Sequence, residues 1–358
     1  MNDSISVARP EAITPQWMTA ALAARGIRAK VRSLTSKAVG TGQLGETHRF
    51  QLSYEGPVPA DAPVTLIGKF PSADPVSAQT GCDLGIYRTE VMFYRELASR
   101  TKMRTPRALV SQINDDDQFV LLFEDLSPAM QGDQMKGCSV QDARKVLQEA
   151  VLLHSAFWND DSLMNKSWVQ VPEGAQSFYT TDLIERSWHH VQQNYTGALT
   201  TDVEQVCDRF ARNHAWWNRP RGRPKHFSHN DYRVDNMMFD GRDGRVAIVD
   251  WQTAGYLGAG MDVSYFLGGA LDRETRKRHE QALLREYYNG LLENGVRDYS
   301  FETLQRDYAH YCFAAVAVAI AATLIVKRTD RGDQMLMQMV TSAALQALDN
   351  HALDDLPA

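Results

Sequence analysis

The spacing of apolar and polar positions divides the chain into a strand-rich first part and a helical second part. From about Ala29 to Leu126, short segments either alternate or are continuously apolar, which is typical of strands. Strands are predicted over 48–54, 64–70 and 118–126, and helices over 10–25 and 87–100. Apolar residues at helical spacing distinguish 87–100 from the strands around it.

Helical periodicity dominates after Leu126. Helices are predicted over 140–158, 179–194, 201–217, 262–271, 274–294 and 301–326. Two short apolar segments, 236–240 and 246–251, interrupt them and predict a β-ribbon. A loop-like segment, 127–137, precedes the helices. The pattern therefore predicts an α+β fold with two domains, residues 1–126 and 127–358.

One uncharged stretch, Tyr311–Val326, tests whether the chain enters a membrane. It has 16 residues, whereas a membrane-spanning helix needs about 20. Charged residues flank it on both sides. We expect a buried helix and no membrane association.

Composition and charge mainly exclude certain partners and kinds of site. The net charge of −6 comes from 44 acidic and 38 basic residues, and no basic domain stands out, so we expect no nucleic-acid partner. The cysteines are far apart and form no Cys-x-x-Cys pair, which predicts neither a zinc site nor a disulfide framework. They are Cys82, Cys138, Cys207 and Cys312. The N-terminal residues lack an apolar signal core, and we expect a cytoplasmic protein.

The segment "HNDYRVDN" carries the strongest chemical signal. His229, Asp231 and Asn236 have the spacing of the catalytic loop in phosphoryl-transfer enzymes, where the Asp accepts a hydroxyl proton and the Asn holds a metal ion. Arg233, two residues after the Asp, is a candidate partner for the transferred phosphate. The alternative is an ordinary polar turn, because His, Asp and Asn are all common in turns.

A second acidic residue strengthens this interpretation. Asp250 lies next to the end of the apolar segment 246–251, and a β-ribbon would return it toward Asn236. An Asp in this position is the second metal ligand of kinase-like sites. The alternative is a carboxylate that caps a turn. Trp251 follows, where protein kinases have the Phe of Asp-Phe-Gly.

The strand-rich part contains a candidate nucleotide site. Gly40, Gly42 and Gly45 form a G-x-G-x-x-G pattern, but a strand follows the third glycine, whereas a dinucleotide fingerprint requires a helix there. A kinase-like glycine loop over the phosphates is therefore favoured over an oxidoreductase site. A flexible hairpin turn is the remaining alternative.

Lys69 lies within the apolar strand 64–70 and needs either solvent or an acidic partner. Glu90 borders the apolar face of the helix 87–100, so we expect it to pair with Lys69; Glu96, on the opposite face, remains an alternative. The segment Phe123–Leu126 ends the last strand of the first domain. Phe123, Glu124 and Leu126 are candidates for the hinge that binds adenine through backbone groups.

Two further residues are expected to be structural. Asp262 precedes an apolar helix and is expected to be its N-cap, and it would also be placed to brace the catalytic loop. His154 lies in the apolar segment "LLHSAFW", and we expect a core histidine with satisfied hydrogen bonds.

These motifs together resemble the aminoglycoside and choline phosphotransferase-like kinases. The segments "HNDYRVDNMMFD", "VAIVDWQTAG" and "GMDVSYFL" carry the resemblance, which spans about Val39 to Leu267 and is closest to a bacterial branch similar to kinase domains fused to acyl-CoA dehydrogenases. It implies a protein-kinase-like fold with two lobes. It also implies that Asp231 is the catalytic base, Asn236 and Asp250 hold Mg²⁺, and Lys69 binds the ATP phosphates.

The sequence departs from the family at two positions. Asn230 replaces the Gly of much of this branch, and "WQTAG" lacks the acid expected after Trp251. Neither change removes a proton acceptor or a metal ligand, so we expect an active kinase that uses ATP and Mg²⁺. A nucleotide-binding pseudokinase is the alternative from another class.

The acceptor is expected to be a hydroxyl of a small molecule. Five of the seven tryptophans fall between residues 158 and 217, which we expect to wall the acceptor pocket. Aromatic walls favour a partly apolar alcohol or a hydroxyacyl compound, while an aminoglycoside or choline-type acceptor remains the alternative. The sequence leaves the oligomeric state and the choice between ATP and GTP open.

Overall fold

A computed structural model describes the chain except for residues 1–4, 41–43, 171–176, 327 and 358. It contains two compact units. Unit 1 comprises Met1–Ala129 and Ala247–Thr253, and unit 2 comprises Met130–Val246 and Ala254–Ala358. The sequence-based division had assigned 247–253 to the second domain. These seven residues instead group with the first, and they include Asp250.

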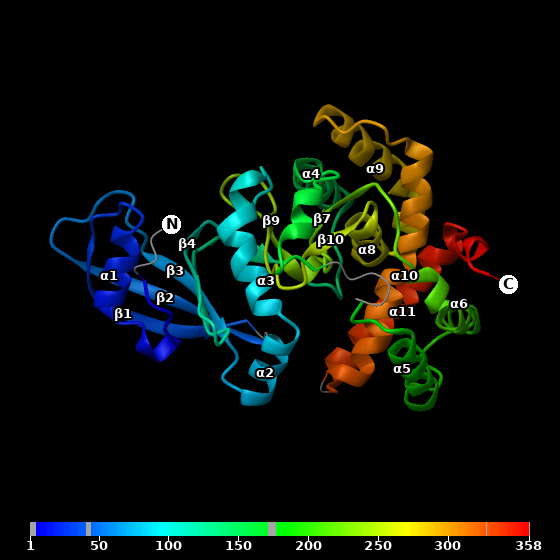
Figure 1. Cartoon of the computed structure of the whole chain (residues 1–358), viewed down its shortest axis with the longest axis horizontal. Coiled ribbons are helices and arrows are strands. Elements are labelled where there is room, and N and C mark those ends of the chain that lie inside the picture. Colours follow the sequence, from blue (N-terminus) through cyan, green and yellow to red (C-terminus); the bar gives the residue numbers. More distant parts are fainter. Residues whose placement is uncertain (1–4, 41–43, 171–176, 327, 358) are drawn as a thin grey trace. The chain divides into compact units, whose positions relative to one another are not determined.

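Unit 1 is built on a five-stranded antiparallel sheet in the order β1-β2-β3-β5-β4 (Figure 1). The strands are β1 (Lys30–Val39), β2 (Gly45–Glu55), β3 (Thr65–Pro71), β4 (Ala108–Ile113) and β5 (Phe119–Glu124). Alternation buries Phe50 and Leu52 of β2 on the face that also receives Leu66 and Phe70 of β3. The three predicted strands are confirmed, whereas β1 and β4 had not been delimited.

Helices cover the sheet of unit 1. They are α1 (Pro15–Ala23), α2 (Pro75–Asp83), α3 (Ile86–Met92) and the continuation of α3 through Phe93–Leu97 and Ala98–Arg100. The helix predicted over 87–100 is thus confirmed. α1 packs on the sheet with Met18 and Leu22 buried in its core. Asp74 caps α2, accepting a hydrogen bond from the backbone N–H of Ser77 at 2.8 Å.

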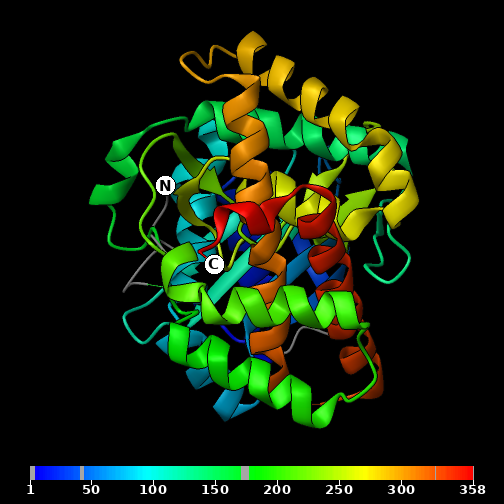
Figure 2. The same cartoon turned by 90° about the vertical axis from the view of Figure 1, so that its right-hand side faces the viewer.

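Unit 2 is mainly helical (Figure 2). Its helices are α4 (Val140–Ala156), α5 (Thr181–Asn194), α6 (Thr201–Arg212), α7 (His214–Trp217), α8 (Met261–Ala270), α9 (Arg273–Glu293), α10 (Phe301–Ile325) and α11 (Asp330–Asp349). Five of them, α4, α5, α8, α9 and α10, match predicted helices. The predicted helix 201–217 breaks at Asn213 into α6 and α7, and α11 had not been predicted.

The uncharged stretch lies in α10, which packs against α5, α8 and α11 (orange in Figure 2). Val316 and Ile320 are fully buried. Among the described residues, α10 is the one helix long and apolar enough to cross a membrane by length and composition, and most of its apolar segment is buried. The prediction of a buried helix is confirmed.

Short strands flank the candidate catalytic loop of unit 2. They are β6 (Met130–Gln131), β7 (Lys225–Ser228), β8 (Met237–Phe239) and β10 (Gly255–Gly258), while β9 (Ala247–Ile248) belongs to unit 1. β7 pairs antiparallel with β10, and β6 pairs antiparallel with β8. The segment that joins β7 to β8 contains His229, Asp231 and Asn236.

Candidate functional site

In unit 1, Lys69 lies between two carboxylates. Its Nζ is 2.6 Å from Glu90 Oε2 on α3 and 2.7 Å from Asp250 Oδ1 in the segment Ala247–Thr253. The ion pair expected with Glu90 is present, and Glu96 does not form it. Because Lys69 pairs with Thr47 and Leu121 in the sheet, its backbone is fixed on both sides.

The charges of this cluster depend on one another. Burial alone would lower the pKa of the Lys69 ammonium, but the carboxylates of Asp250 and Glu90 outweigh it and raise that pKa, so the lysine stays charged. Burial raises the pKa of Glu90, and Lys69 opposes the rise. The lysine therefore carries a permanent positive charge that two neighbours hold in place, as a phosphate ligand requires.

The segment that carries Asp250 is anchored in unit 1 by its neighbours. The Trp251 ring stacks on Phe93 with centroids 3.8 Å apart and an interplanar angle of 11°, and the Ile248 N–H donates to the Arg104 carbonyl at 2.9 Å. Asp250 itself has φ +67°, a left-handed conformation that Asp tolerates better than most residues. The buried tryptophan next to it keeps the carboxylate at Lys69.

The glycine turn connects β1 and β2. Gly40 has φ +79°, which disfavours any side chain there, and a Cβ on Gly45 would lie 3.1 Å from the Phe70 carbonyl. Gly42 lies outside the described residues. The Tyr87 hydroxyl donates to the Leu44 carbonyl at 2.5 Å and so ties the turn to α3. A strand begins at Gly45, which contradicts the oxidoreductase alternative.

The hinge candidates lie at the end of β5. Phe123 is buried against Tyr94, with ring centroids 4.7 Å apart. The Glu124 carboxylate accepts hydrogen bonds from Arg104 at 2.7 Å and from the Arg107 N–H at 2.8 Å. These contacts give the Glu124 side chain a structural role. The Leu126 carbonyl accepts the Ala129 N–H at 2.9 Å.

In unit 2, Asp262 of α8 accepts hydrogen bonds from the backbone of the candidate catalytic loop, residues 229–236. Its carboxylate accepts the backbone N–H groups of His229 at 2.7 Å and Asn230 at 2.9 Å, and it lies 3.1 Å from His154 Nε2. Burial would raise the pKa of Asp262, but its histidine neighbours lower it below the usual range, so the carboxylate stays charged. The N-cap prediction is wrong, because Gly260, with φ +95°, occupies that position.

Two histidines complete this support. His154 is fully buried, and its Nδ1 lies 2.8 Å from the Tyr287 hydroxyl, so the expectation of a satisfied core histidine is confirmed. The His229 ring is also fully buried, and its Nδ1 accepts the Asp231 N–H at 3.3 Å. His229 therefore shapes the loop from within the core.

The Asp231 carboxylate is partly exposed and has three donors around it. Arg233 Nε lies 3.1 Å from Oδ1, Asn236 Nδ2 donates to Oδ2 at 2.8 Å, and the Tyr265 hydroxyl lies 3.3 Å from Oδ1. Burial, followed by the charge of Asp231, raises the pKa of Tyr265 well above its usual value. Tyr265 thus remains a protonated donor that orients the carboxylate.

The side chain of Asn236 is suitable as a metal ligand. Its Nδ2 group donates to both the carbonyl and the carboxylate of Asp231, which turns Oδ1 away from them. Within the described part of the chain, that oxygen accepts no hydrogen bond. An amide oxygen and a carboxylate are the hard ligands that Mg²⁺ prefers.

Gln134 is a supporting residue that the sequence did not reveal. Its Oε1 accepts the Val234 N–H at 2.9 Å, its own N–H donates to Asp235 at 2.8 Å, and its Nε2 donates to the Gly269 carbonyl at 3.1 Å. Arg233 also contacts Asp235. Gln134 was missed because its partners are about a hundred residues away and leave no local pattern.

A pocket in unit 2 borders the catalytic loop at Asn230. Its lining residues are Ser177, Tyr179, Trp217, Asn218, Arg219, Arg221, Asn230, Leu257, Met261, His310, Tyr311, Ala314, Ala317 and Val318. None of these is Asp or Glu. Of the five tryptophans expected here, Trp217 lines the pocket, whereas Trp168 and Trp188 are buried elsewhere in the core and Trp158 and Trp216 are not among the lining residues. α10 supplies much of the wall instead.

Sequence comparison gives the family. A family model described as the ecdysteroid kinase-like family matches residues 42–297, more than half of the chain. The chain belongs to the ecdysteroid kinase-like family. The matched range contains Gly42 and Gly45 of the glycine pattern, Lys69, Glu90, the catalytic loop and Asp250, while Gly40 precedes it. A search of curated proteins finds no significant match.

Solved structures support the fold of this kinase-like protein. An ethanolamine kinase of Plasmodium vivax superimposes with a TM-score of 0.55 and 10% identity, covering 91% of this chain and 86% of the other. A Ralstonia eutropha protein described as an aminoglycoside phosphotransferase gives 0.54 and 13%, covering 95% and 99%. An aminoglycoside phosphotransferase with GDP and kanamycin gives 0.53 and 13%, covering 90% and 97%. The protein-kinase-like fold and the suspected kinase relationship are confirmed.

Proposed function

We propose that this protein is a phosphotransferase that uses ATP and Mg²⁺ to phosphorylate a hydroxyl of a small, partly apolar molecule. The observation that carries the proposal is the Asp231 carboxylate, which is oriented by Arg233, Asn236 and Tyr265 on a loop that borders an apolar pocket. A partly exposed carboxylate in this loop is suited to accept a proton from a hydroxyl that enters from the pocket.

The chemistry divides between the two units. Lys69, kept charged and positioned by Glu90 and Asp250, would bind the ATP phosphates. Asp231 would orient the acceptor hydroxyl and take its proton while the hydroxyl oxygen bonds to the γ-phosphorus. The bond between that phosphorus and the bridging oxygen breaks, so the products are ADP and a phosphate monoester. Arg233 would balance charge at the transferred group.

Asn236 and Asp250 would hold the metal ion. When bound, Mg²⁺ supplies charge neutralisation at the phosphates. Asn236 offers its amide oxygen, because its Nδ2 group makes the contacts with Asp231, and Asp250 offers a carboxylate that also contacts the Lys69 ammonium. Each of these two side chains, taken within its own unit, is an oxygen ligand of the kind that Mg²⁺ prefers.

The pocket supports an apolar acceptor over a polycation. A buried ammonium without a paired carboxylate costs several kcal/mol, and among the described residues the pocket lining offers Arg219 and Arg221 but neither Asp nor Glu. Trp217, Leu257 and Met261 would bury hydrocarbon instead. The ecdysteroid of the family name and a hydroxyacyl compound are both hydroxylated molecules of this kind. An aminoglycoside or choline-type acceptor is therefore disfavoured.

A pseudokinase role is also disfavoured. Lys69, Asp231, Asn236 and Asp250 are all present, and each has neighbours that orient it. A protein that only binds a nucleotide does not need an oriented proton acceptor beside a pocket.

The proposal is tested by measuring ADP release from MgATP with three acceptor classes at equal concentrations: an ecdysteroid, a hydroxylated fatty acid and kanamycin. We expect turnover above the ATP-only background with one or both of the first two. Background rates with every alcohol, or a kcat/KM for kanamycin near 10⁴ M⁻¹s⁻¹, roughly the lower edge for ordinary enzymes, would contradict it.

A further inference from the structure

A short basic segment precedes the catalytic loop. Residues 219–225 read "RPRGRPK", which places four cations in seven residues of a chain whose net charge is −6. The segment connects α7 to β7, and β7 leads directly to His229. Its two prolines restrict the backbone. The kinase motifs do not account for this concentration of charge.

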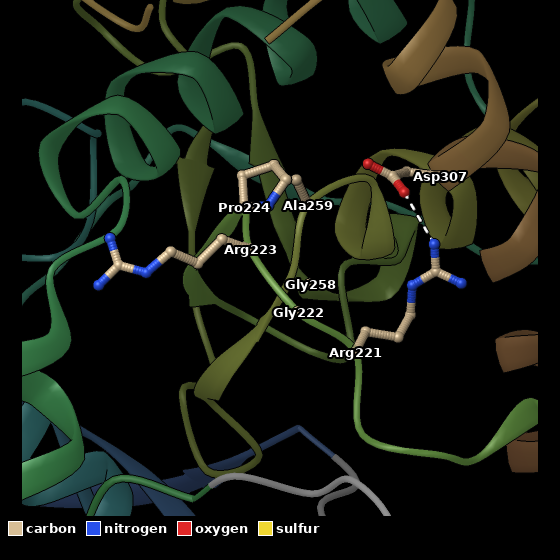
Figure 3. A pocket seen from close by; sticks show the side chains of 7 residues that line it. All are labelled: Arg221, Gly222, Arg223, Pro224, Gly258, Ala259 and Asp307. Atoms are coloured by element: carbon tan, nitrogen blue, oxygen red, sulfur yellow. Dashed lines mark hydrogen bonds and ion pairs between the residues drawn. The ribbon is translucent and has the colours of Figure 1, made fainter. Parts of the chain in front are cut away.

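The arginines of the segment have different partners. Arg221 points toward Asp307, at 3.0 Å, while Arg223 points the opposite way (Figure 3) and pairs with Asp161. Arg219 lies over the Trp216 ring at 4.5 Å, and its Nε donates to the Trp216 carbonyl at 2.9 Å. Within the part of the chain that the structure describes, Arg219 pairs with no carboxylate.

Arg219 and Arg221 line the same pocket as Asn230, the neighbour of Asp231. The remainder of that pocket is largely apolar, with Trp217 stacked on His310 at 5.3 Å and 18°. A guanidinium that is oriented by an aromatic ring and a carbonyl, and that lacks an acidic partner, offers its outer N–H groups to an anion. The pocket therefore combines apolar walls with a cationic edge.

We propose that the acceptor carries an anionic group, a carboxylate or a phosphate, and that Arg219 binds it while the apolar body fills the pocket. Arg221 adds positive charge at the same edge although Asp307 already engages it. The proposal rests on the assignment of this pocket to the acceptor. It makes Arg219 a specificity-determining residue, because a cationic acceptor would meet two arginines and, among the described lining residues, no carboxylate.

The test measures binding by calorimetry with four probes of equal chain length: 8-hydroxyoctanoate, 8-hydroxyoctyl phosphate, 1,8-octanediol and 8-amino-1-octanol. We expect at least one anionic probe to bind roughly tenfold tighter than the diol, as one charge-assisted hydrogen bond provides, and the amine to bind most weakly. The stronger of the two anions identifies the group that the site prefers.

Arg219→Gln should remove the preference for the anion and leave diol binding unchanged. Arg223→Gln is the matched control, since it removes the same charge from the same segment but on the side that faces Asp161. Equal binding of anion and diol, preference for the amine, equal effects of both variants, or no binding of any probe would overturn the proposal.

Phosphoryl transfer is measured separately on the same probes. Anion-selective binding that depends on Arg219 but gives no ADP would contradict the kinase function and leave the anion site standing. Turnover of the diol as efficient as that of the anions would contradict the anion site and leave the kinase function standing.

Discussion

Lys69 illustrates how single residues of the candidate site depend on their neighbours. Its ammonium is within 2.7 Å of both Glu90 and Asp250, and most of its side chain is removed from water. Either carboxylate alone would leave less compensation for burial. With both, the lysine keeps its charge and has one orientation, which lowers the cost of organising it when phosphates bind.

Replacement of Lys69 by Met should lower ATP affinity by about tenfold or more, because a charge-assisted contact to phosphate is lost. It should also lower the free energy of unfolding by ~1–3 kcal/mol, since Glu90 and Asp250 would face each other without the cation. Calorimetry and urea unfolding measure the two effects. Lys30→Met is the control, as its ion pair with Glu55 is solvent-exposed; equal effects of both changes would contradict the role of Lys69.

The elements of unit 2 fix the catalytic loop through Asp262. This carboxylate sits in the first turn of α8, and its three donors come from the loop and from α4. One residue thereby couples two helices to the backbone next to Asp231. His154 contributes from α4 and is itself held by Tyr287 of α9.

Asp262→Ala should reduce the free energy of unfolding by ~3 kcal/mol or more, because a buried N–H group, a partly buried N–H group and a buried histidine lose their acceptor. Urea unfolding provides the measurement. Asp272→Ala is the control, because Asp272 is an exposed N-cap of α9 and its loss should cost only ~1 kcal/mol. A loss for Asp262→Ala no larger than the control's would mean that the loop does not depend on this brace.

The sequence predicted elements where the pattern is local and missed contacts that are distant along the chain. The catalytic loop was recognisable because its chemistry has a fixed spacing. Tyr265 and Gln134 were not, because they reach Asp231 and Val234 across the fold. An Asp before an apolar helix predicts an N-cap, and Asp262 fits that pattern, but Gly260 in a left-handed conformation occupies the N-cap position of this helix.

At the scale of the whole molecule, buried histidines make stability depend on pH. Burial lowers the pKa of His214 to about 4, and burial together with Arg221 lowers that of His310 to about 3. The unfolded chain, with a histidine pKa near 6.5, therefore binds more protons than the folded chain between these values. The contribution that these two neutral histidines make to the free energy of unfolding is therefore present above about pH 6.5 and is lost as the pH falls toward 4.

We expect the free energy of unfolding to fall by roughly 2–4 kcal/mol between pH 7.5 and pH 5.0. His214→Gln should flatten this dependence, because glutamine does not titrate. Urea unfolding at the two pH values measures it. The same decrease in the variant and in the wild type would show that His214 does not contribute.

Nucleotide binding should stabilise the whole molecule by linkage. We expect MgATP to raise Tm more than ATP with EDTA, and Asp250→Ala to lose the magnesium-dependent part of that increase. Asp116→Ala, in an exposed loop, is the control and should behave as the wild type. An unchanged magnesium effect in Asp250→Ala would remove Asp250 from the metal site.

We expect Asp231 to orient an acceptor hydroxyl and take its proton as the hydroxyl oxygen bonds to the γ-phosphorus of ATP. Phosphorus NMR tests this role most directly. It is recorded with the acceptor that gives the highest ADP release, and wild type and Asp231→Asn are compared at equal saturation with MgATP. We expect a phosphate monoester signal that grows with ADP in the wild type and grows roughly two to four orders of magnitude more slowly in the variant. Equal rates of monoester formation in the two proteins would contradict this role of Asp231.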